Sequence, residues 1–294
     1  MDSPIGKVPQ PEIADKGALV TIRRQLVDTD FGQIHVRICG HGPAIVMAHI
    51  NQQSSDLYAE LMRELAPDFT SIAVDYPSHG MSDHIPFQPT IGDYAECIVQ
   101  VLDRLGITKA VALGEATGAA VATELGGSHA EHIPAVILLN CPFYKNRKQA
   151  DTTHAPLKQT FRPSDASGFP LTRTLDFMLE TDPAHAPLHP TQDWMDRINL
   201  AQIQCGRHRW QALDALNAYD VGEGLKRIEG PVLLLMGEHF HYAGIIHEYR
   251  ERIRRLDAIE IIPDGRFCLG WEKANDVAAL VSTFLRPHRS LVTM

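Results

Sequence analysis

Residues Lys109-Ala-Val-Ala-Leu-Gly-Glu-Ala-Thr-Gly-Ala-Ala-Val-Ala-Thr-Glu-Leu125 decide the fold. An apolar run, 109–113, leads into a turn with glycines at 114 and 118, and residues 117–125 then continue as an alanine-rich segment. A short apolar run that ends at glycine predicts a buried strand, and the periodic segment after it predicts a helix. The stretch therefore predicts a strand, a tight turn and a helix in direct succession.

The same alternation continues on both sides of this stretch. Two strand-like runs, 19–27 and 33–38, come first and are joined by the turn signal Asp28-Thr-Asp-Phe-Gly32. Short apolar strands then alternate with helices, which predicts right-handed crossovers and a mostly parallel α/β sheet with flanking helices. We expect strands at 44–48, 70–74, 109–113, 135–139, 231–236 and 258–262, and helices at 54–65, 91–105, 117–125, 245–256 and 274–285.

The alternation is interrupted between residues 141 and 229. This stretch is rich in proline, histidine and threonine, and its expected helices, 172–180, 190–204 and 210–218, are not separated by strands. We expect residues 18–140 and 230–290 to form the core, 141–229 to form a helical cap or lid, and 1–17 to be a flexible N-terminal arm. Parallel sheets bind ligands at the carboxyl ends of their strands, which here lie beneath the lid.

Composition excludes several classes of protein. Of 294 residues, 44% are apolar, which excludes a disordered chain, and no apolar run approaches the ~18 residues of a membrane span. The 36 acidic residues outnumber 27 Lys and Arg, for a net charge of −9, so we expect no nucleic-acid partner. Five scattered cysteines without a C-x-x-C pair and no signal pattern predict a cytoplasmic protein with reduced thiols and no membrane association.

Three segments resemble the α/β-hydrolase superfamily, and the resemblance extends over nearly the whole chain. Asp75-Tyr-Pro-Ser-His-Gly-Met-Ser-Asp83 resembles the family's D-x-P-G-x-G-x-S-D segment, with Ser78 where glycine is usual. Gly114-Glu-Ala-Thr-Gly118 resembles the nucleophile elbow G-x-S-x-G. Pro263-Asp-Gly-Arg-Phe-Cys-Leu-Gly-Trp-Glu272 resembles the stretch that holds the catalytic histidine. The resemblance implies an α/β-hydrolase sheet with its active site at the strand ends.

The positions that the resemblance assigns to a catalytic triad hold other residues. Ala116 stands at the nucleophile position, Phe240 at the acid position and Arg266 at the histidine position. These side chains cannot attack, orient a base or transfer a proton as serine, aspartate and histidine do, so we do not expect an acyl-enzyme mechanism. A serine-to-alanine change engineered to trap a substrate would explain Ala116 and leave Phe240 and Arg266 unexplained.

An oxyanion hole is still expected at the elbow. The resemblance implies the backbone N–H of Thr117 as one donor and Asn51 as the second, with Ala116, His49 and Phe240 beside them in the binding site. Such donors can stabilise an enolate, a phenolate or a developing carbonyl anion. They predict a lyase, isomerase, cyclase or cofactor-free rearrangement enzyme whose substrate is a small, largely apolar or aromatic carbonyl or phenolic metabolite.

Two charged residues are candidates for chemistry at this site. Glu115 adjoins the elbow and is expected either to act as a general acid or base with a raised pKa or to accept hydrogen bonds from local backbone. Arg266 is expected either to bind a substrate carboxylate or phenolate or to turn outward to an acid such as Glu272. His49 follows the third strand, and in the resembled family a histidine there is mostly structural.

His239 and His241 flank Phe240, and either could replace the missing base, although both could also lie on the surface. No further histidine or carboxylate completes a metal-binding spacing with this pair, so we expect no metal site. No Gly-x-Gly-x-x-Gly or Walker pattern is present, so we expect no nucleotide cofactor.

Two other functions stay open. One is a non-catalytic protein that binds a small molecule or a partner enzyme. The other is a hydrolase with a displaced triad, such as Thr117 or Cys141 with His241, or with an engineered change at Ala116. The sequence also leaves open whether the protein forms a homodimer.

Overall fold

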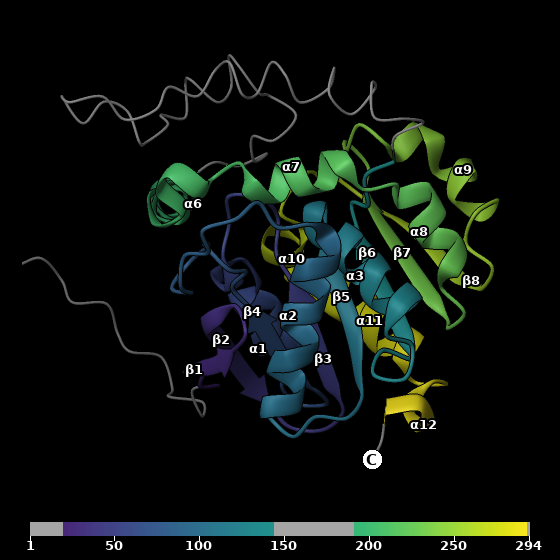
Figure 1. Ribbon diagram of the computed structural model, residues 1–294. Coiled ribbons are helices and arrows are strands. Elements are labelled where there is room, and N and C mark those ends of the chain that lie inside the picture. Colours follow the sequence, from purple (N-terminus) through teal and green to yellow (C-terminus); the bar gives the residue numbers. More distant parts are fainter. Residues whose placement is uncertain (1–19, 144–190, 293–294) are drawn as a thin grey trace, which may run out of the picture.

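The computed structural model describes residues 20–143 and 191–292, which contain one eight-stranded sheet. The strand order is β1-β2-β4-β3-β5-β6-β7-β8. β1 and β2 are antiparallel to their neighbours, and the strands from β4 to β8 run parallel, so the expected mostly parallel sheet is confirmed (Figure 1). The strands are β1 Arg23–Thr29, β2 Gly32–Gly40, β3 Ala44–Ala48, β4 Thr70–Val74, β5 Ala110–Glu115, β6 Ala135–Leu139, β7 Val232–Gly237 and β8 Leu256–Ile262.

Helices cover both faces of this sheet. Two hydrophobic clusters form the core: one joins the sheet to α2, α3 and α8, and the other joins it to α1, α10 and α11. The α-helices are α1 Ala59–Leu65, α2 Ile91–Arg104, α3 Thr117–Ser128, α6 Gln192–Cys205, α7 Gln211–Ala218, α8 Val221–Arg227, α9 Ile246–Arg250, α10 Leu269–Glu272, α11 Ala274–Leu285 and α12 Arg289–Val292. Short 3₁₀ turns occupy Ser55–Tyr58, Gly206–His208 and Ala243–Ile245.

The central strands form where the sequence is apolar on both faces. Every residue of β3, β5, β6 and β7 is buried, as expected for parallel strands covered by helices on both sides. Alternate side chains of β5 enter opposite clusters: Ala112 belongs to the α3 side, whereas Leu113 belongs to the α1 side. Glu115 lies two residues after Leu113, and its side chain therefore points to the α1 side.

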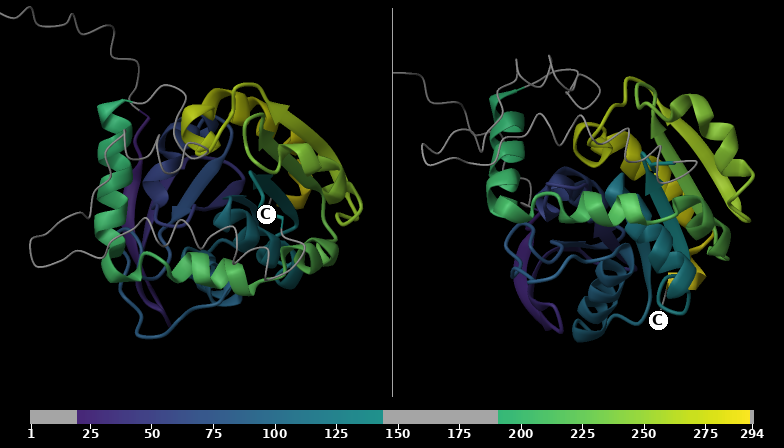
Figure 2. Two further views of the ribbon diagram at one scale, coloured as in Figure 1. Left: turned by 90° about the horizontal axis from the view of Figure 1, so that it is seen from above. Right: turned by 45° about the horizontal axis from the view of Figure 1, so that its top comes forward.

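Helices α6 and α7 lie above the strands in the view of Figure 1, and seen from above they lie along two adjacent sides of the core (Figure 2, left). The N–H of Leu213 in α7 donates to Asn51 Oδ1 at 3.1 Å, which places α7 over the turn that follows β3. These two helices agree with the expected helices 190–204 and 210–218. The third expected cap helix, 172–180, and the arm 1–17 lie outside the described residues.

The structure corrects one expected helix. Residues 245–256 were expected to be helical throughout, but α9 ends at Arg250 and Leu256 begins β8. The residues from Arg255 onward pair with β7 in place of continuing the helix. The Val232 N–H donates to the Arg255 carbonyl at 2.9 Å, and Leu256 is in register with Val232. Helices α8 and α10 were not expected. Within the described ranges, none of the helices combines the length and the apolar character needed to cross a bilayer.

Candidate active site

The turn between β5 and α3 has the geometry of a nucleophile elbow. Ala116 has φ 50° and ψ −112°, outside the usual regions for a non-glycine residue, and its N–H donates to the Leu139 carbonyl at 3.0 Å. A Cβ on Gly114 would lie 2.0 Å from the Gly118 carbonyl oxygen, and one on Gly118 would lie 1.9 Å from the Ala48 carbonyl oxygen. Glycine is therefore required on both sides of Ala116, which stands at the apex of the turn and is 7% exposed as a residue.

The first amide of α3 belongs to Thr117, which follows this apex directly. The first N–H groups of an α-helix have no carbonyl partner within the helix and carry the positive end of its dipole. Asn51 lies in the turn after β3, and its Oδ1 accepts from Leu213. Its donors are therefore the side-chain Nδ2 and the backbone N–H. Its use as the second oxyanion donor stays a prediction.

His49 is fully buried in a network that holds the turn after β3. Its Nδ1 lies 2.8 Å from the Ile50 carbonyl, and its Nε2 accepts the Tyr76 N–H at 3.2 Å, which assigns the proton to Nδ1. The Tyr76 hydroxyl donates to the His49 carbonyl at 2.8 Å. Burial lowers the pKa of His49 to about 4, so the ring is neutral and structural, the alternative that the sequence left open.

Asp75 holds the neighbouring turn, the segment that resembles D-x-P-G-x-G-x-S-D. Its carboxylate lies 2.8 Å from His35 Nδ1 and accepts the N–H groups of Ser55 at 2.6 Å and Met81 at 2.9 Å. These partners outweigh burial and lower its pKa to about 2. A Cβ on Gly80, at φ 53°, would lie 2.1 Å from Asp75 Oδ2, so this carboxylate also requires the glycine.

Glu115 is completely buried and contacts the segment that leads into α10. Its Oε1 accepts the Leu269 N–H at 2.8 Å and Asn140 Nδ2 at 3.0 Å, and its Oε2 accepts the Gly270 N–H at 3.3 Å. Burial raises its pKa to about 7 although these hydrogen bonds oppose the shift. These contacts correspond to the backbone-binding role named above, whereas a role in proton transfer stays a prediction.

Asn140 is a site residue that the sequence analysis missed. It follows β6 with φ 45°, is fully buried, and donates from Nδ2 both to Glu115 and to the Arg266 carbonyl, the latter at 2.7 Å. Its Oδ1 accepts the Gly237 N–H at 2.9 Å. A polar residue directly after an apolar strand was the available signal, and asparagine tolerates positive φ better than most residues. Asn140 links the ends of β5 and β7 to the turn that holds Arg266.

The loop after β7, which holds the acid position of the resembled family, carries packed aromatic side chains. Phe240 is 4% exposed, and its ring centroid lies 5.9 Å from that of Phe267 and 4.4 Å from that of His241. His241 and His239 are exposed. His239 faces the turn of Asp264, where its Nε2 lies 3.9 Å from Asp264 Oδ1.

Arg266 is half-buried near Glu272. Burial and the charge of Glu115 raise the pKa of Glu272 to about 7, and the nearby charge of Arg266 opposes the shift. Arg266 therefore lies within electrostatic reach of Glu272, the outward partner considered from the sequence.

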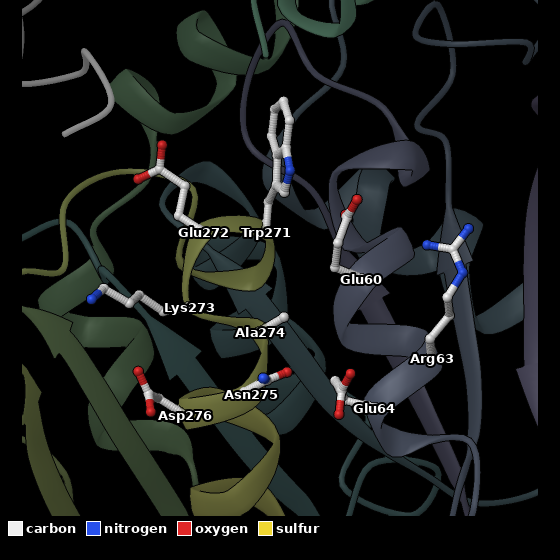
Figure 3. Close-up of a pocket in the computed structure, with 9 residues that line it drawn as sticks. All are labelled: Glu60, Arg63, Glu64, Trp271, Glu272, Lys273, Ala274, Asn275 and Asp276. Atoms are coloured by element: carbon white, nitrogen blue, oxygen red, sulfur yellow. The ribbon is translucent and has the colours of Figure 1, made fainter. Parts of the chain in front are cut away.

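A groove of about 500 Å³ opens beside Glu272, between α1 and the segment α10–α11. Figure 3 shows Trp271 and Glu272 at one end and Glu64 and Asp276 toward the other. The groove is lined by Glu60, Arg63, Glu64, Trp271, Glu272, Lys273, Ala274, Asn275 and Asp276. Four of these side chains are acidic and two are basic.

Helix α6 packs against the core at Trp271. The guanidinium of Arg197 lies 3.7 Å from the Trp271 ring centroid, and the Trp194 ring is stacked on Trp271 at 6.0 Å. Arg197 also forms ion pairs with Asp56 at 3.0 Å and Glu60 at 2.8 Å. Arg197 therefore joins α6 both to α10 and to the start of α1, and Trp194 adds a second contact with α10.

The sheet order, the strained elbow and the buried aspartate after β4 define the class of α/β-hydrolase-fold proteins. The sequence model of the alpha/beta hydrolase fold matches residues 43–271, and the chain belongs to this family.

The relatives of this chain include a putative non-heme haloperoxidase of Mycobacterium phage D29, to which it is 29% identical over 116 residues, 39% of this chain and 42% of the relative. It is 29% identical over 118 residues to haloalkane dehalogenase 2 of Mycobacterium bovis, which is 40% of this chain and 41% of the relative. It is 28% identical over 128 residues to 2-(acetamidomethylene)succinate hydrolase of Mesorhizobium japonicum, 43% of this chain and 46% of the relative. The chain thus matches less than half the length of these relatives. An epoxide hydrolase from an endophytic Streptomyces superposes with a TM-score of 0.73 over 92% of this chain and 96% of that one, at 16% identity.

Proposed function

We propose that this protein is a non-hydrolytic enzyme that stabilises an enolate or phenolate formed from a small, largely apolar or aromatic carbonyl or phenolic metabolite. The observation that carries the proposal is the elbow itself. The strained conformation at Ala116 and the two close glycine contacts are kept around a methyl group that cannot act as a nucleophile. A conformation of this kind costs about 1–3 kcal/mol and persists where it serves a function.

The proposed function of the elbow is to aim the Thr117 N–H at a developing negative charge. The N-terminus of α3 adds a favourable dipole, and Asn51 supplies the second donor. Because neither donor depends on the side chain at position 116, loss of the nucleophile leaves oxyanion stabilisation in place. This chemistry suits proton transfer, cyclisation or rearrangement, in which no acyl group is held by the enzyme.

The replaced triad positions define the rest of the proposed site. Phe240, packed against Phe267, presents an apolar surface to an aromatic substrate. Arg266 binds a carboxylate or phenolate oxygen, and the nearby charge of Glu272 attracts its guanidinium in the absence of ligand. His241 is the proposed base, one residue beyond the usual acid position, and Glu115 is a second candidate because its pKa lies near 7.

The alternative function is a binding protein without catalysis. The contacts of Glu115 favour this alternative. Its carboxylate accepts hydrogen bonds from Leu269, Gly270 and Asn140, and these bonds give it a structural role at the start of α10. The two functions differ in what happens to a bound ketone: the enzyme exchanges its α-protons, whereas the binding protein does not.

Proton NMR of aryl ketones in D₂O tests the proposal without knowledge of the natural substrate. We expect this protein to accelerate exchange of α-protons for deuterium, and His241→Ala and Arg266→Ala each to slow the exchange by about 10²-fold or more. His247→Ala and Arg255→Ala, which change exposed residues of the same types, are the matched controls and should leave the rate unchanged.

A second measurement uses 4-nitrophenol and naphthols as oxyanion mimics. An oxyanion hole lowers the pKa of a bound phenol, so the phenolate absorbance band should grow with protein concentration below the free phenol's pKa. If the phenolate binds but the α-protons of the ketone do not exchange, the binding-protein alternative is established. If the α-protons do not exchange and the phenolate does not bind, the oxyanion site itself is contradicted.

A further inference from the structure

The turns that follow β7 and β8 are joined side by side. β7 ends at Gly237, which is in register with Ile262 at the end of β8. Beyond this pair, the Glu238 N–H donates to the Ile262 carbonyl at 3.1 Å and the His239 N–H donates to the Gly265 carbonyl at 2.9 Å. These backbone hydrogen bonds fix the two turns relative to each other and bring Asp264 beside Glu238 and His239.

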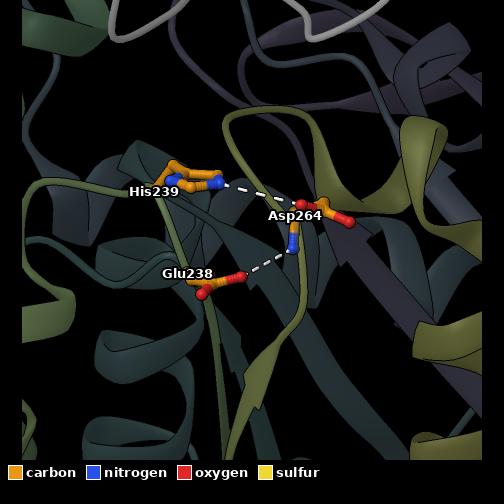
Figure 4. A group of neighbouring side chains, drawn as sticks. All are labelled: Glu238, His239 and Asp264. Atoms are coloured by element: carbon orange, nitrogen blue, oxygen red, sulfur yellow. Dashed lines mark hydrogen bonds and ion pairs between the residues drawn. The ribbon is translucent and has the colours of Figure 1, made fainter.

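Three side chains of these turns present their polar atoms to one another (Figure 4). One imidazole nitrogen and one oxygen from each carboxylate lie within 4.8 Å of one another, and all three residues are exposed. His239 Nε2 lies 3.9 Å from Asp264 Oδ1, which is longer than a hydrogen bond, and Glu238 Oε2 accepts the Asp264 N–H at 3.0 Å. Within residues 20–143 and 191–292 this is the one group of three such donors.

The donor set and its dimensions fit a transition-metal ion. In the tetrahedral geometry of Zn²⁺, bonds of about 2.1 Å to imidazole nitrogen and carboxylate oxygen place two ligand atoms about 3.4 Å apart. The three donors lie within 4.8 Å of one another, and all three side chains are exposed and can rotate toward a bound ion. Imidazole favours Zn²⁺, Co²⁺ or Ni²⁺ over Mg²⁺ and Ca²⁺, and two carboxylates balance the charge of a divalent ion.

We propose that Glu238, His239 and Asp264 bind one divalent transition-metal ion of the Zn²⁺ class. Three protein ligands leave further coordination positions for water. The ion cross-links the turn of Phe240, which follows His239 directly, to the turn of Arg266, two residues beyond Asp264. Metal binding therefore stabilises the two turns that hold the proposed substrate-binding residues. This inference is independent of which reaction the protein catalyses.

Isothermal titration of the whole chain with Zn²⁺, free of other chelators, tests the site. We expect one binding site that is weakened at least about tenfold by His239→Ala, Asp264→Asn or Glu238→Gln. Asp264→Asn suits the left-handed φ of 54°, and Glu238→Gln keeps an acceptor for the Asp264 N–H, so both variants should fold. His247→Ala is the control, because it removes an exposed histidine of α9 outside the group and should bind Zn²⁺ as the wild type does.

Two readouts separate this site from adventitious binding to other histidines. Zn²⁺ should raise the Tm of the wild type and of His247→Ala, and raise it less in the three ligand variants, because an ion that binds only the folded state stabilises it. Co²⁺ should give visible d–d bands that the His239→Ala variant loses. Equal affinity and equal Tm response in wild type, His239→Ala and Asp264→Asn would overturn the proposal, as would the absence of Zn²⁺ binding to the wild type.

Discussion

The side-chain nitrogen of Asn140 lies 3.0 Å from Oε1 of Glu115. Glu115 is the last residue of β5, and Asn140 directly follows the neighbouring strand β6. Asn140 also binds the Arg266 carbonyl and the Gly237 N–H, while Glu115 accepts from the backbone at the start of α10. One buried amide and one buried carboxyl group therefore connect β5, β6 and β7 to the turn that would carry a catalytic histidine in an ordinary hydrolase.

Asn140→Ala should destabilise the protein by about 2–4 kcal/mol, because it removes the acceptor of the buried Gly237 N–H, the donor to the Arg266 carbonyl and one of the three hydrogen bonds to Glu115. Urea unfolding followed by circular dichroism measures this change. Asn275→Ala, at an exposed position of α11, is the control and should change the free energy of unfolding by no more than about 0.5 kcal/mol. Equal stabilities for the two variants would show that the Asn140 network contributes nothing.

Glu115 should make the protein less stable as the pH rises from about 4.5 to about 7. Its pKa is raised on folding from 4.5 to about 7, so in this range the folded state binds more protons than the unfolded state. The contribution is fully present below about pH 4.5 and lost above pH 7, and it amounts to about 3 kcal/mol. Buried His49, with its pKa lowered to about 4, acts in the opposite direction between about pH 4 and 6.5.

Because these two effects overlap, the informative quantity is the difference between wild type and Glu115→Gln. We expect the free energy of unfolding of the wild type, minus that of the variant, to fall between pH 5 and pH 7 and to level off above pH 7. Urea titrations at four or five pH values give this difference. A difference that is constant with pH would mean that Glu115 is ionised to the same extent in the folded and unfolded states.

Arg197→Ala should loosen α6. The substitution removes ion pairs with Asp56 and Glu60 and the contact of the guanidinium with Trp271, for an expected loss of about 1–2 kcal/mol. Amide hydrogen exchange in residues 192–205 should become faster while exchange in the central strands is unaffected. The exposed Arg207, just beyond α6, provides the control variant Arg207→Ala, and equal exchange in the two variants would argue against fastening by Arg197.

Ala116→Ser alone should not create an esterase. The serine fits the strained elbow, but Phe240 and Arg266 supply neither the acid nor the histidine of a catalytic triad. Hydrolysis of activated aryl esters should stay at the level of Ala116 protein, whereas the triple variant Ala116→Ser, Phe240→Asp, Arg266→His should exceed it. Multiple-turnover hydrolysis by Ala116→Ser would indicate that another residue, first of all His241, serves as the base.

The sequence was sufficient for the fold because its patterns are local. Uninterrupted apolar runs such as 135–139, glycines at both ends of the elbow and amphipathic helices such as 91–105 each reflect burial or turn geometry within a few residues. The prediction of one helix over 245–256 was wrong because the end of this segment is determined by a long-range contact. Its last residues pair with β7, a long-range hydrogen-bonding contact that local periodicity does not contain.

The sequence by itself determined the parallel sheet, the elbow around Ala116 and the identity of the side chains at its catalytic positions. Only the tertiary structure decided which candidate side chains meet. It directs Glu115 to Asn140 and α10, buries His49 against Tyr76, and brings Asp264 to Glu238 and His239 across 25 or more residues of chain. The reason is physical: strand and helix periodicity fix the direction of a side chain within its element, whereas the partner it meets depends on how distant elements pack.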